Sequence, residues 1–360
     1  MKVAILGAGP AGLACAIECE KLGIDAVLIE RSISVGWMWP SVNYWPNMYY
    51  NHFGVKGARE YLKQYYGVDF TVLNDTKSIL MKSPGKQVDI TGTLGLTISR
   101  GKFQNSLENQ LVHKLGKIPV YYNYLGDYKA LSKEYDYVVV ATGKETEARD
   151  MGLWQNESRV YIIGSTVAGN FDINSSTIYF NTEYAGTGYA RLTPFNSHIA
   201  VIGLYLIGMP EFKAQELYYK FIKMEKLDSV DCFNLIMPPA FTIGKVTSFQ
   251  KNNVFLVGRA AGLVDNVIGI GGVEAMISGT MAARAIKEKK DYNNMVKPLQ
   301  THIENISAFR KVIDKFTNTD FDKLITILGT PGIKHIIYNT KIDMVGKIGS
   351  ILKALQATKQ

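Results

Sequence analysis

The segment Lys2-Val-Ala-Ile-Leu6-Gly7-Ala-Gly-Pro-Ala-Gly12 decides how this chain folds. A short apolar strand runs into glycines spaced G-x-G-x-x-G, and a helix is expected from Leu13 to Leu22. In such a loop the first glycine permits a tight turn, the second lets a pyrophosphate approach the backbone, and the third lets helix and strand pack closely. The N–H groups at the start of the helix then face the phosphates. The segment therefore predicts a site for the ADP half of a dinucleotide.

A second strand with an acid at its end follows the helix. The apolar stretch Asp25–Glu30 reads as this strand, and Glu30 lies about 20 residues beyond the glycines, where a carboxylate can bind the ribose hydroxyls. Strand, helix and strand within about 30 residues are typical of a βαβ unit. The start of the chain therefore predicts an α/β fold with a Rossmann-like parallel sheet.

A second glycine-rich loop favours FAD over NAD. The strand Val254–Val257 leads into Gly258–Gly272, and a helix is expected to begin near Gly271. Such a loop would direct further backbone donors at an anion or a flavin carbonyl. NAD dehydrogenases do not need this late loop, whereas ribitol and isoalloxazine extend beyond the ADP site. FAD is therefore the predicted cofactor.

Other segments continue the pattern along the chain. They are Glu30-Arg31, Arg100-x-x-Phe103-x-x-x-Leu107, Ala141-Thr-Gly143, Gly188-Tyr-Ala-Arg-Leu-Thr-Pro194 and the late loop Gly258–Gly272. With the first loop, they resemble the geranylgeranyl reductase group of the p-hydroxybenzoate hydroxylase-type flavoproteins. The resemblance implies an FAD-dependent oxidoreductase with an FAD-binding domain, a β-rich substrate domain and a helical C-terminal tail. The expected domains are 1–36, 98–150 and 251–290 for FAD, 37–97 and 151–250 for substrate, and 291–360 for the tail.

Several positions depart from the family pattern. Arg259 stands where the family has an aspartate, Thr142 replaces the aspartate of Ala-Asp-Gly, and Asn266 replaces a proline. The strand Gly188–Pro194 matches the family's Gly-Tyr-x-Trp-x-Phe-Pro only in part. The cofactor-binding residues expected from the motifs and the resemblance are Gly7, Gly9, Pro10, Ala11, Gly12, Glu30, Arg31, Arg100, Ala141, Gly143, Gly258, Asp265, Gly269, Gly271 and Gly272.

An aromatic segment, residues 37–53, is the candidate wall of a substrate pocket. The pocket candidates are Trp37, Trp39 and Trp45 from this segment, with Tyr189 and Arg191 from the substrate domain. Ordinary core packing is the alternative, because aromatic side chains dominate cores as well. No catalytic acid or base can be chosen from the sequence. The five histidines show no ligand spacing, so no metal site is expected.

Three functions fit these features. The leading one is reduction of carbon–carbon double bonds in an apolar, isoprenoid or lipid-like substrate, with NADPH or a ferredoxin-like protein as electron donor. The second is a flavin monooxygenase of a small aromatic or apolar substrate, and the third a non-catalytic flavin-binding electron carrier. Disulfide reductases are not expected, because Gly164–Gly169 lacks the central glycine of a second nucleotide loop and no C-x-x-C pair is present.

Composition narrows the partners and the location. The net charge is +8, but no block of consecutive like charges points to nucleic acid. Ile342 to Leu355 has an apolar helical stripe with interleaved lysines, which predicts either a helix docked on its own domain or a peripheral contact with an anionic membrane. The expected location is the cytoplasm, with membrane association as an option. The sequence gives no oligomeric state.

Overall fold

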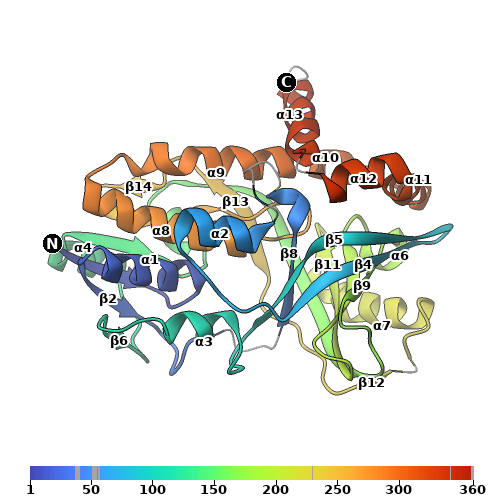
Figure 1. The fold of residues 1–360 in the computed structure, drawn as a ribbon, viewed down its shortest axis with the longest axis horizontal. Helices are drawn as coiled ribbons and strands as arrows, with labels where there is room; N and C mark the ends of the chain where they lie inside the picture. The colour runs from blue at the N-terminus through green and yellow to red at the C-terminus, as the bar shows by residue number, and fades with distance from the viewer. Residues whose placement is uncertain (37–40, 51–54, 56, 229, 341, 358–360) are drawn as a thin grey trace.

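The computed structural model describes residues 1–36, 41–50, 55, 57–228, 230–340 and 342–357. This part of the chain forms two sheets, with helices packed over them (Figure 1). One sheet is mainly parallel and contains the N-terminal strand. The other sheet has more strands and is mainly antiparallel. The C-terminal region is helical. The fold class predicted from the sequence is therefore confirmed.

The smaller sheet has six strands in the order β14-β15-β7-β1-β2-β6. All neighbours pair in parallel except β14 with β15. Parallel strands end at a common edge, so the loops that follow β1, β2, β7 and β15 meet there. The strands are β1 (Lys2–Leu6), β2 (Asp25–Ile29), β6 (Val120–Tyr121), β7 (Tyr137–Val140), β14 (Gln250–Lys251) and β15 (Val254–Leu256).

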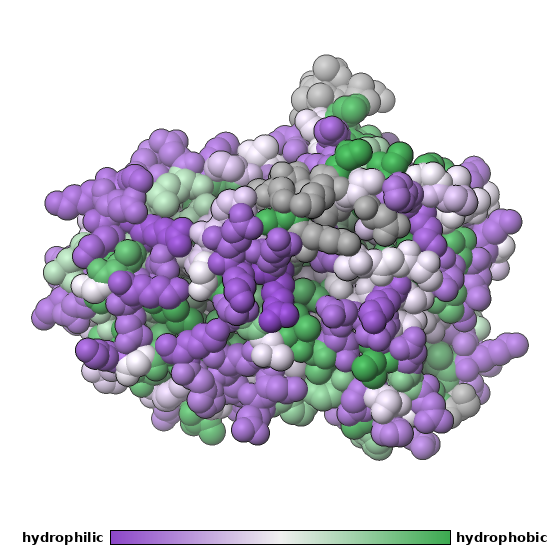
Figure 2. Space-filling model, viewed as in Figure 1, coloured by the Kyte–Doolittle hydropathy of each residue, from purple (hydrophilic) through white to green (hydrophobic). Residues whose placement is uncertain are grey.

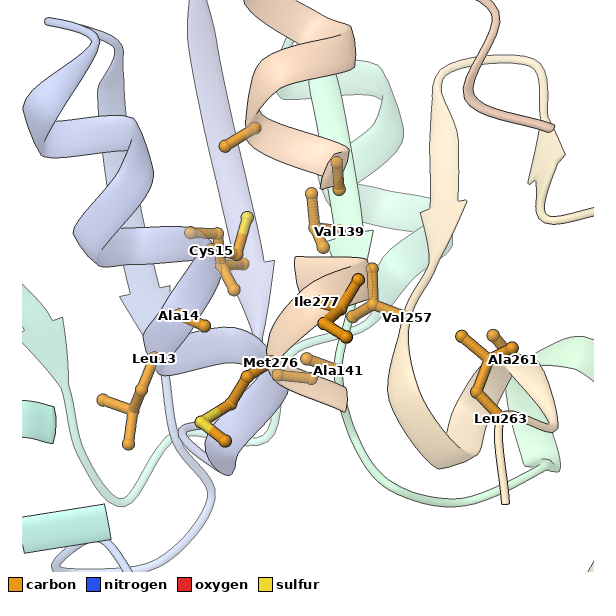
Figure 3. Packing of buried hydrophobic residues seen from close by; sticks show 14 of the residues in the cluster. Leu13, Ala14, Cys15, Val139, Ala141, Val257, Ala261, Leu263, Met276 and Ile277 are labelled. Carbon is orange, nitrogen blue, oxygen red and sulfur yellow. The ribbon is translucent and has the colours of Figure 1, made fainter. Parts of the chain in front are cut away.

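Two helices pack closely beside this sheet. Helix α1 spans Pro10–Lys21 and so begins before the predicted Leu13, because Gly9 is its N-cap and proline fits the first turn. Helix α8 spans Gly272–Glu288, and a Cβ on its Gly279 would lie 2.0 Å from the Ala11 carbonyl oxygen. Figure 3 shows Leu13, Ala14 and Cys15 of α1 near Met276 and Ile277 of α8. Only glycine at position 279 allows this close approach of the two helices.

The larger sheet has nine strands. The order is β12-β8-β11-β10-β9-β4-β5-β3, with β13 also paired to β8. The segment Gly164–Gly169, which resembles part of a nucleotide loop, lies mostly within β8 rather than in a turn. The strands are β3 (Ser41–Pro46), β4 (Asn74–Ser83), β5 (Lys86–Arg100), β8 (Trp154–Ala168), β9 (Ser175–Tyr179), β10 (Tyr189–Pro194), β11 (Ile199–Ile207), β12 (Asp231–Cys232) and β13 (Phe241–Val246).

The C-terminal helices cover part of the larger sheet. Ile325 and Tyr338 pack against Ile79 and Ile90 of the sheet in one buried cluster. In Figure 1 the last helix, α13, rises at the top of the view, and it packs against the end of α9, where a Cβ on Gly349 would lie 2.0 Å from the Asn305 carbonyl oxygen. The remaining α-helices are α2 (Ala58–Tyr66), α3 (Leu107–Val112), α4 (Tyr128–Glu134), α5 (Thr146–Asp150), α6 (Thr182–Ala185), α7 (Ala214–Met224), α9 (Tyr292–Ser307), α10 (Arg310–Ile313), α11 (Asn318–Gly329), α12 (Pro331–Asn339) and α13 (Met344–Ala357).

The strands of the two sheets come from interleaved parts of the chain. The smaller sheet takes its strands from residues 2–29, 120–140 and 250–256, and the larger sheet from residues 41–100 and 154–246. The domain boundaries given above stay a prediction. Helix α3 is shorter than the predicted Phe103–Leu115, because the Ser106 hydroxyl accepts the Asn109 N–H and caps its start.

Candidate functional site

The first glycine loop has the geometry that a bound pyrophosphate requires. Gly7 has φ +102°, and a Cβ on it would lie 2.6 Å from the Ala141 carbonyl oxygen. A Cβ on Gly12 would lie 1.9 Å from the Gly7 carbonyl oxygen, whereas a Cβ on Gly9 would meet no protein atom within 4 Å. The loop is therefore closed on its inner side and open at Gly9. The first N–H groups of α1 have no side-chain cap, which leaves them free for an anion.

Glu30 lies at the end of β2 beside this loop. One carboxylate oxygen accepts the Ala8 N–H at 2.9 Å, and the other accepts the Ser32 N–H at 2.8 Å. The side chain stays partly exposed, and each oxygen can accept a further hydrogen bond. These two bonds fix the Glu30 carboxylate beside the loop, and its binding to a ribose stays a prediction. Arg31, also predicted, is exposed.

The loops after β7 and β15 meet at the same edge of the sheet. Gly143 has φ +66° and Gly258 has φ +57°, so both occupy turns that favour glycine. The Arg259 guanidinium donates from Nε to the Gly143 carbonyl and lies 5.1 Å from the Phe241 ring centroid. Burial lowers the pKa of Arg259. A cation thus stands where the family pattern has an aspartate.

Asp265 shapes the late loop rather than facing outward. Its carboxylate accepts N–H groups from Val267, Ile268 and Ile270 at 2.7–2.9 Å, and its side chain is buried. These bonds fold the loop back on itself before α8 begins, and Gly269 supports the turn with φ +73°. The contact of Asp265 with FAD stays a prediction.

The close packing of Gly271 and Gly272 sets where α8 starts. A Cβ on Gly271 would lie 2.5 Å from the Leu263 carbonyl oxygen, and one on Gly272 would lie 2.6 Å from the Trp45 ring. Trp45 is only 1% exposed and also packs edge-on against Phe70. Trp45 therefore packs in the core, as in the alternative given above, and the structure contradicts the prediction that it forms a pocket wall. Trp37 and Trp39 lie outside the described residues.

Arg100 forms a buried ion pair. Its Nε donates to a Glu108 carboxylate oxygen at 2.7 Å, and its Nη1 donates to the Asn43 side chain at 3.1 Å. The Glu108 side chain is 2% exposed, so the arginine compensates a buried charge. The arginine of the Arg-x-x-Phe motif thus joins β5 to α3. Its contact with flavin stays a prediction.

Tyr189 and Arg191 lie together on β10, next to the late loop. The Tyr189 hydroxyl donates to the Ile268 carbonyl at 2.8 Å, and its ring stacks on Tyr205 at 4.6 Å. Both rings line a small pocket between this loop and the larger sheet, together with Ile162, Ile207, Phe241 and Ile268. The pocket is mostly apolar. It connects the predicted cofactor loop with the predicted substrate sheet.

A buried acid beside the late loop was not found from the sequence. Glu274, in the first turn of α8, accepts a hydrogen bond from the Tyr50 hydroxyl at 2.8 Å, and its second carboxylate oxygen has no partner among the described residues. Burial, with the nearby charge of Asp265, raises the pKa of Glu274 to about 7. Its position after the glycines gives no hint of this burial, because the partner Tyr50 is far away in the sequence. Within the described residues, no cluster of three or more metal-binding side chains is found.

This arrangement defines a class, the dinucleotide-binding oxidoreductases. A model of the pyridine nucleotide-disulphide oxidoreductase family matches residues 1–210, more than half of the 360 residues, and the chain belongs to this family. A disulfide reductase was not expected from the sequence. The family match shows that this expectation is wrong for the family, which includes such enzymes by name. The absence of a second nucleotide loop at Gly164–Gly169 still holds, because these residues lie mostly in a strand.

Relatives in archaea extend the similarity beyond the family match. The chain is 25% identical to the digeranylgeranylglycerophospholipid reductase of Methanocaldococcus jannaschii, over 91% of this chain and 90% of that protein. It is 26% identical to digeranylgeranylglycerophospholipid reductase 1 of Methanosphaera stadtmanae, over 50% of this chain and 48% of that protein, about half its length.

A solved structure shares the fold over nearly the whole chain. The geranylgeranyl bacteriochlorophyll reductase-like protein of Thermoplasma acidophilum has a TM-score of 0.74 and 17% identity, covering 98% of both chains. The chain is an FAD-dependent oxidoreductase, and the predicted resemblance to the geranylgeranyl reductase group is confirmed. An enzyme is thus favoured over a non-catalytic electron carrier.

Proposed function

We propose that this enzyme reduces carbon–carbon double bonds of an apolar, isoprenoid or lipid-like substrate. The observation that carries the proposal is the apolar lining of the small cavity, about 30 Å³, between the late loop and the larger sheet, where Ile268 and Gly269 meet Tyr189 and Phe241. The names of the archaeal relatives, which are reductases of a prenyl phospholipid, support the same substrate class. When bound, reduced FAD supplies the hydride for such a reduction.

The chain's own residues would bind and orient the cofactor. The open backbone at Gly9 and the start of α1 suit the pyrophosphate, and Glu30 suits the ribose. Gly271 and Gly272 would direct the start of α8 at the far end of the cofactor. Electrons would come from NADPH or a ferredoxin-like protein, and anaerobic bleaching of the flavin band by one of the two would identify the donor.

The reaction of the reduced enzyme with oxygen tests this function. Protein loaded with FAD is reduced without oxygen, mixed with aerated buffer, and followed by its visible absorption. A reductase is expected to reoxidise slowly in aerated buffer when no lipid substrate is present. Rapid reoxidation that a small aromatic or apolar compound accelerates would contradict the proposal, because this behaviour is typical of a monooxygenase.

We also propose that the C-terminal helices contact a membrane surface. Exposed isoleucines gather there with exposed lysines, and Figure 2 shows hydrophobic residues beside α13. Apolar side chains with interleaved lysines favour an anionic lipid surface. In the described part of the chain, no helix is long and apolar enough to cross a membrane. The isoleucines are Ile327, Ile333, Ile336, Ile342, Ile348 and Ile351, and the lysines are Lys323, Lys347 and Lys353.

Replacing Ile348 and Ile351 together by glutamate should abolish most of this contact. The two side chains are 40% and 61% exposed, and acidic residues lose the apolar contribution and repel anionic lipid. Flotation with phosphatidylglycerol vesicles should show at least about a tenfold fall in the bound fraction. The control is Ile173→Glu, an exposed isoleucine outside the C-terminal helices. Equal flotation of the double variant and the unchanged protein would contradict the membrane proposal.

A further inference from the structure

Arg259 is a half-buried cation without a carboxylate partner. Its Nε donates to the Gly143 carbonyl, whereas within the described residues neither Nη donates a hydrogen bond and no acid forms an ion pair with the guanidinium. The undescribed residues contain no aspartate or glutamate. By contrast, Arg100 pairs with Glu108 at 2.6 Å. The two Nη groups of Arg259 are therefore available to an anion from outside the chain.

The acids near Arg259 are already paired with other arginines. Burial lowers the pKa of the Arg259 guanidinium, the charge of Glu145 opposes this effect, and the charge of Arg100 adds to it. Glu145 forms an ion pair with Arg149 at 3.6 Å, and Glu108 compensates Arg100. A partly buried charge without a counter-charge of its own is unfavourable unless a ligand supplies one.

Arg259 stands where three loops of the parallel sheet meet. A Cβ on its neighbour Gly258 would lie 3.1 Å from the Cβ of Ala11, which belongs to the first turn of α1. A Cβ on Gly143 would lie 3.9 Å from the Arg259 Nη2, and Gly143 follows β7, the strand beside β15. The guanidinium therefore lies at the junction of the first glycine loop with the loops after β7 and β15.

The first glycine loop offers backbone donors but no positive side chain. Residues 7–12 are uncharged, and the Glu30 carboxylate beside them accepts the Ala8 N–H at 2.9 Å, which adds a negative charge. The start of a helix carries only about half a positive charge. A diphosphate carries more than one negative charge, so a cation beside the loop would supply what the loop lacks.

We propose that Arg259 forms a charge-assisted contact with the diphosphate of bound FAD. The planar fork of a guanidinium suits the paired oxygens of a phosphate. Because this cation stands where the family pattern has an acid, salt should weaken FAD binding through Arg259 itself. The proposal concerns how FAD is held, and it does not depend on which reaction the bound flavin supports.

The affinity for FAD over a range of salt tests the proposal, with the full-length protein freed of its cofactor. From about 0.01 M to about 1 M salt the screening length falls from about 30 Å to about 3 Å, so contacts between partly exposed charges weaken. Fluorescence titration should show that Arg259→Met binds FAD about tenfold more weakly at low salt, with a smaller difference at high salt. Arg259→Lys keeps the charge and should keep most of the salt dependence.

Competition with ADP and adenosine separates a contact with the diphosphate from a change in the shape of the site. The two compounds share the adenosine half of FAD and differ in the diphosphate. Arg259→Met should weaken ADP about as much as FAD and leave adenosine within about twofold. The control is Arg159→Met, which removes the same charge from an exposed position on the larger sheet and should bind FAD like the unchanged protein.

Three outcomes would overturn the assignment. The first is an affinity of the unchanged protein for FAD that salt does not alter, and this test needs no variant to fold. The second is an equal loss for ADP and adenosine, which would mean that Arg259 only shapes the loops. The third is unchanged FAD binding by Arg259→Met; weaker NADPH binding by the same variant would then place the contact on the electron donor. Rapid reaction with oxygen would contradict the reductase function alone, because these measurements involve no turnover.

Discussion

Replacing Gly9 by alanine should weaken FAD binding about tenfold or more while the free protein stays fully folded. A methyl group at this position meets no protein atom within 4 Å, and the backbone of Gly9 has an ordinary φ of −81°. The added group would occupy only the space into which the pyrophosphate is expected to fit. Fluorescence titration with FAD measures the affinity, and thermal unfolding of the cofactor-free protein measures the fold.

The neighbouring glycine provides the contrast. Gly12→Ala should lower the stability of the free protein as well, by about 1–3 kcal/mol or more, because its Cβ would lie 1.9 Å from the Gly7 carbonyl oxygen. Gly332→Ala is the control, since a Cβ there also meets no atom within 4 Å but lies on α12. If Gly9→Ala binds FAD as tightly as Gly332→Ala does, the pyrophosphate does not lie against this loop.

Replacing Glu274 by glutamine should make the protein more stable at alkaline pH. Burial raises the pKa of this carboxyl from 4.5 to about 7, so the folded state holds its proton more tightly than the unfolded state. The unchanged protein therefore loses stability as the pH rises from about 4.5 through about 7. Glutamine keeps the acceptor for Tyr50 and carries no charge. Above pH 7 the variant should gain about 3 kcal/mol in the free energy of unfolding.

Urea unfolding of the purified proteins between pH 4 and pH 9 checks this prediction. The control is Glu288→Gln at the exposed end of the same helix, which should keep the pH profile of the unchanged protein. The groups that face Glu274 electrostatically are Tyr49, Tyr50, Tyr61 and Asp265, and burial raises the pKa of each of the three tyrosines well above its ordinary value. An equal loss of stability by Glu274→Gln at every pH would contradict the account, because it would mean that the carboxylate is held ionised.

The parallel sheet was predictable because its signals are local. The strand Lys2–Leu6, the glycines after it and the buried strand at Val254 each lie within a few residues of the feature that they determine. Glycine spacing reports directly on backbone geometry, which is why Gly7 and Gly12 occupy the predicted turn. The larger sheet was predicted only as a β-rich substrate domain, since its pairings join residues that are far apart.

The site was predictable only in part, for the same reason. The loops that would hold FAD have a sequence signature, whereas the pocket depends on which strands become neighbours. Tyr205 pairs with Tyr189 across β10 and β11, and no local pattern predicts this register. Trp45 shows the opposite case, because an aromatic-rich segment does not reveal whether a ring faces a pocket or the core. Only packing against Gly272 decides it.

Two arginines near this site stand where the family pattern has other residue types. Arg259 replaces an acid near the loop of β7, and Arg191 replaces an aromatic ring on β10. Both guanidiniums lie over aromatic rings of the pocket, Phe241 and Tyr205. Neither guanidinium is among the residues that line the pocket, whose walls are mostly apolar.

The most direct test of the central claim is a single anaerobic turnover. FAD-loaded protein is reduced, freed of excess reductant, and mixed without oxygen with a polyunsaturated prenyl lipid. The account predicts that the oxidised flavin band returns and that mass spectrometry finds product two hydrogen masses heavier, one molecule for each flavin. If the flavin stays reduced with such lipids until air is admitted, the enzyme does not reduce these double bonds.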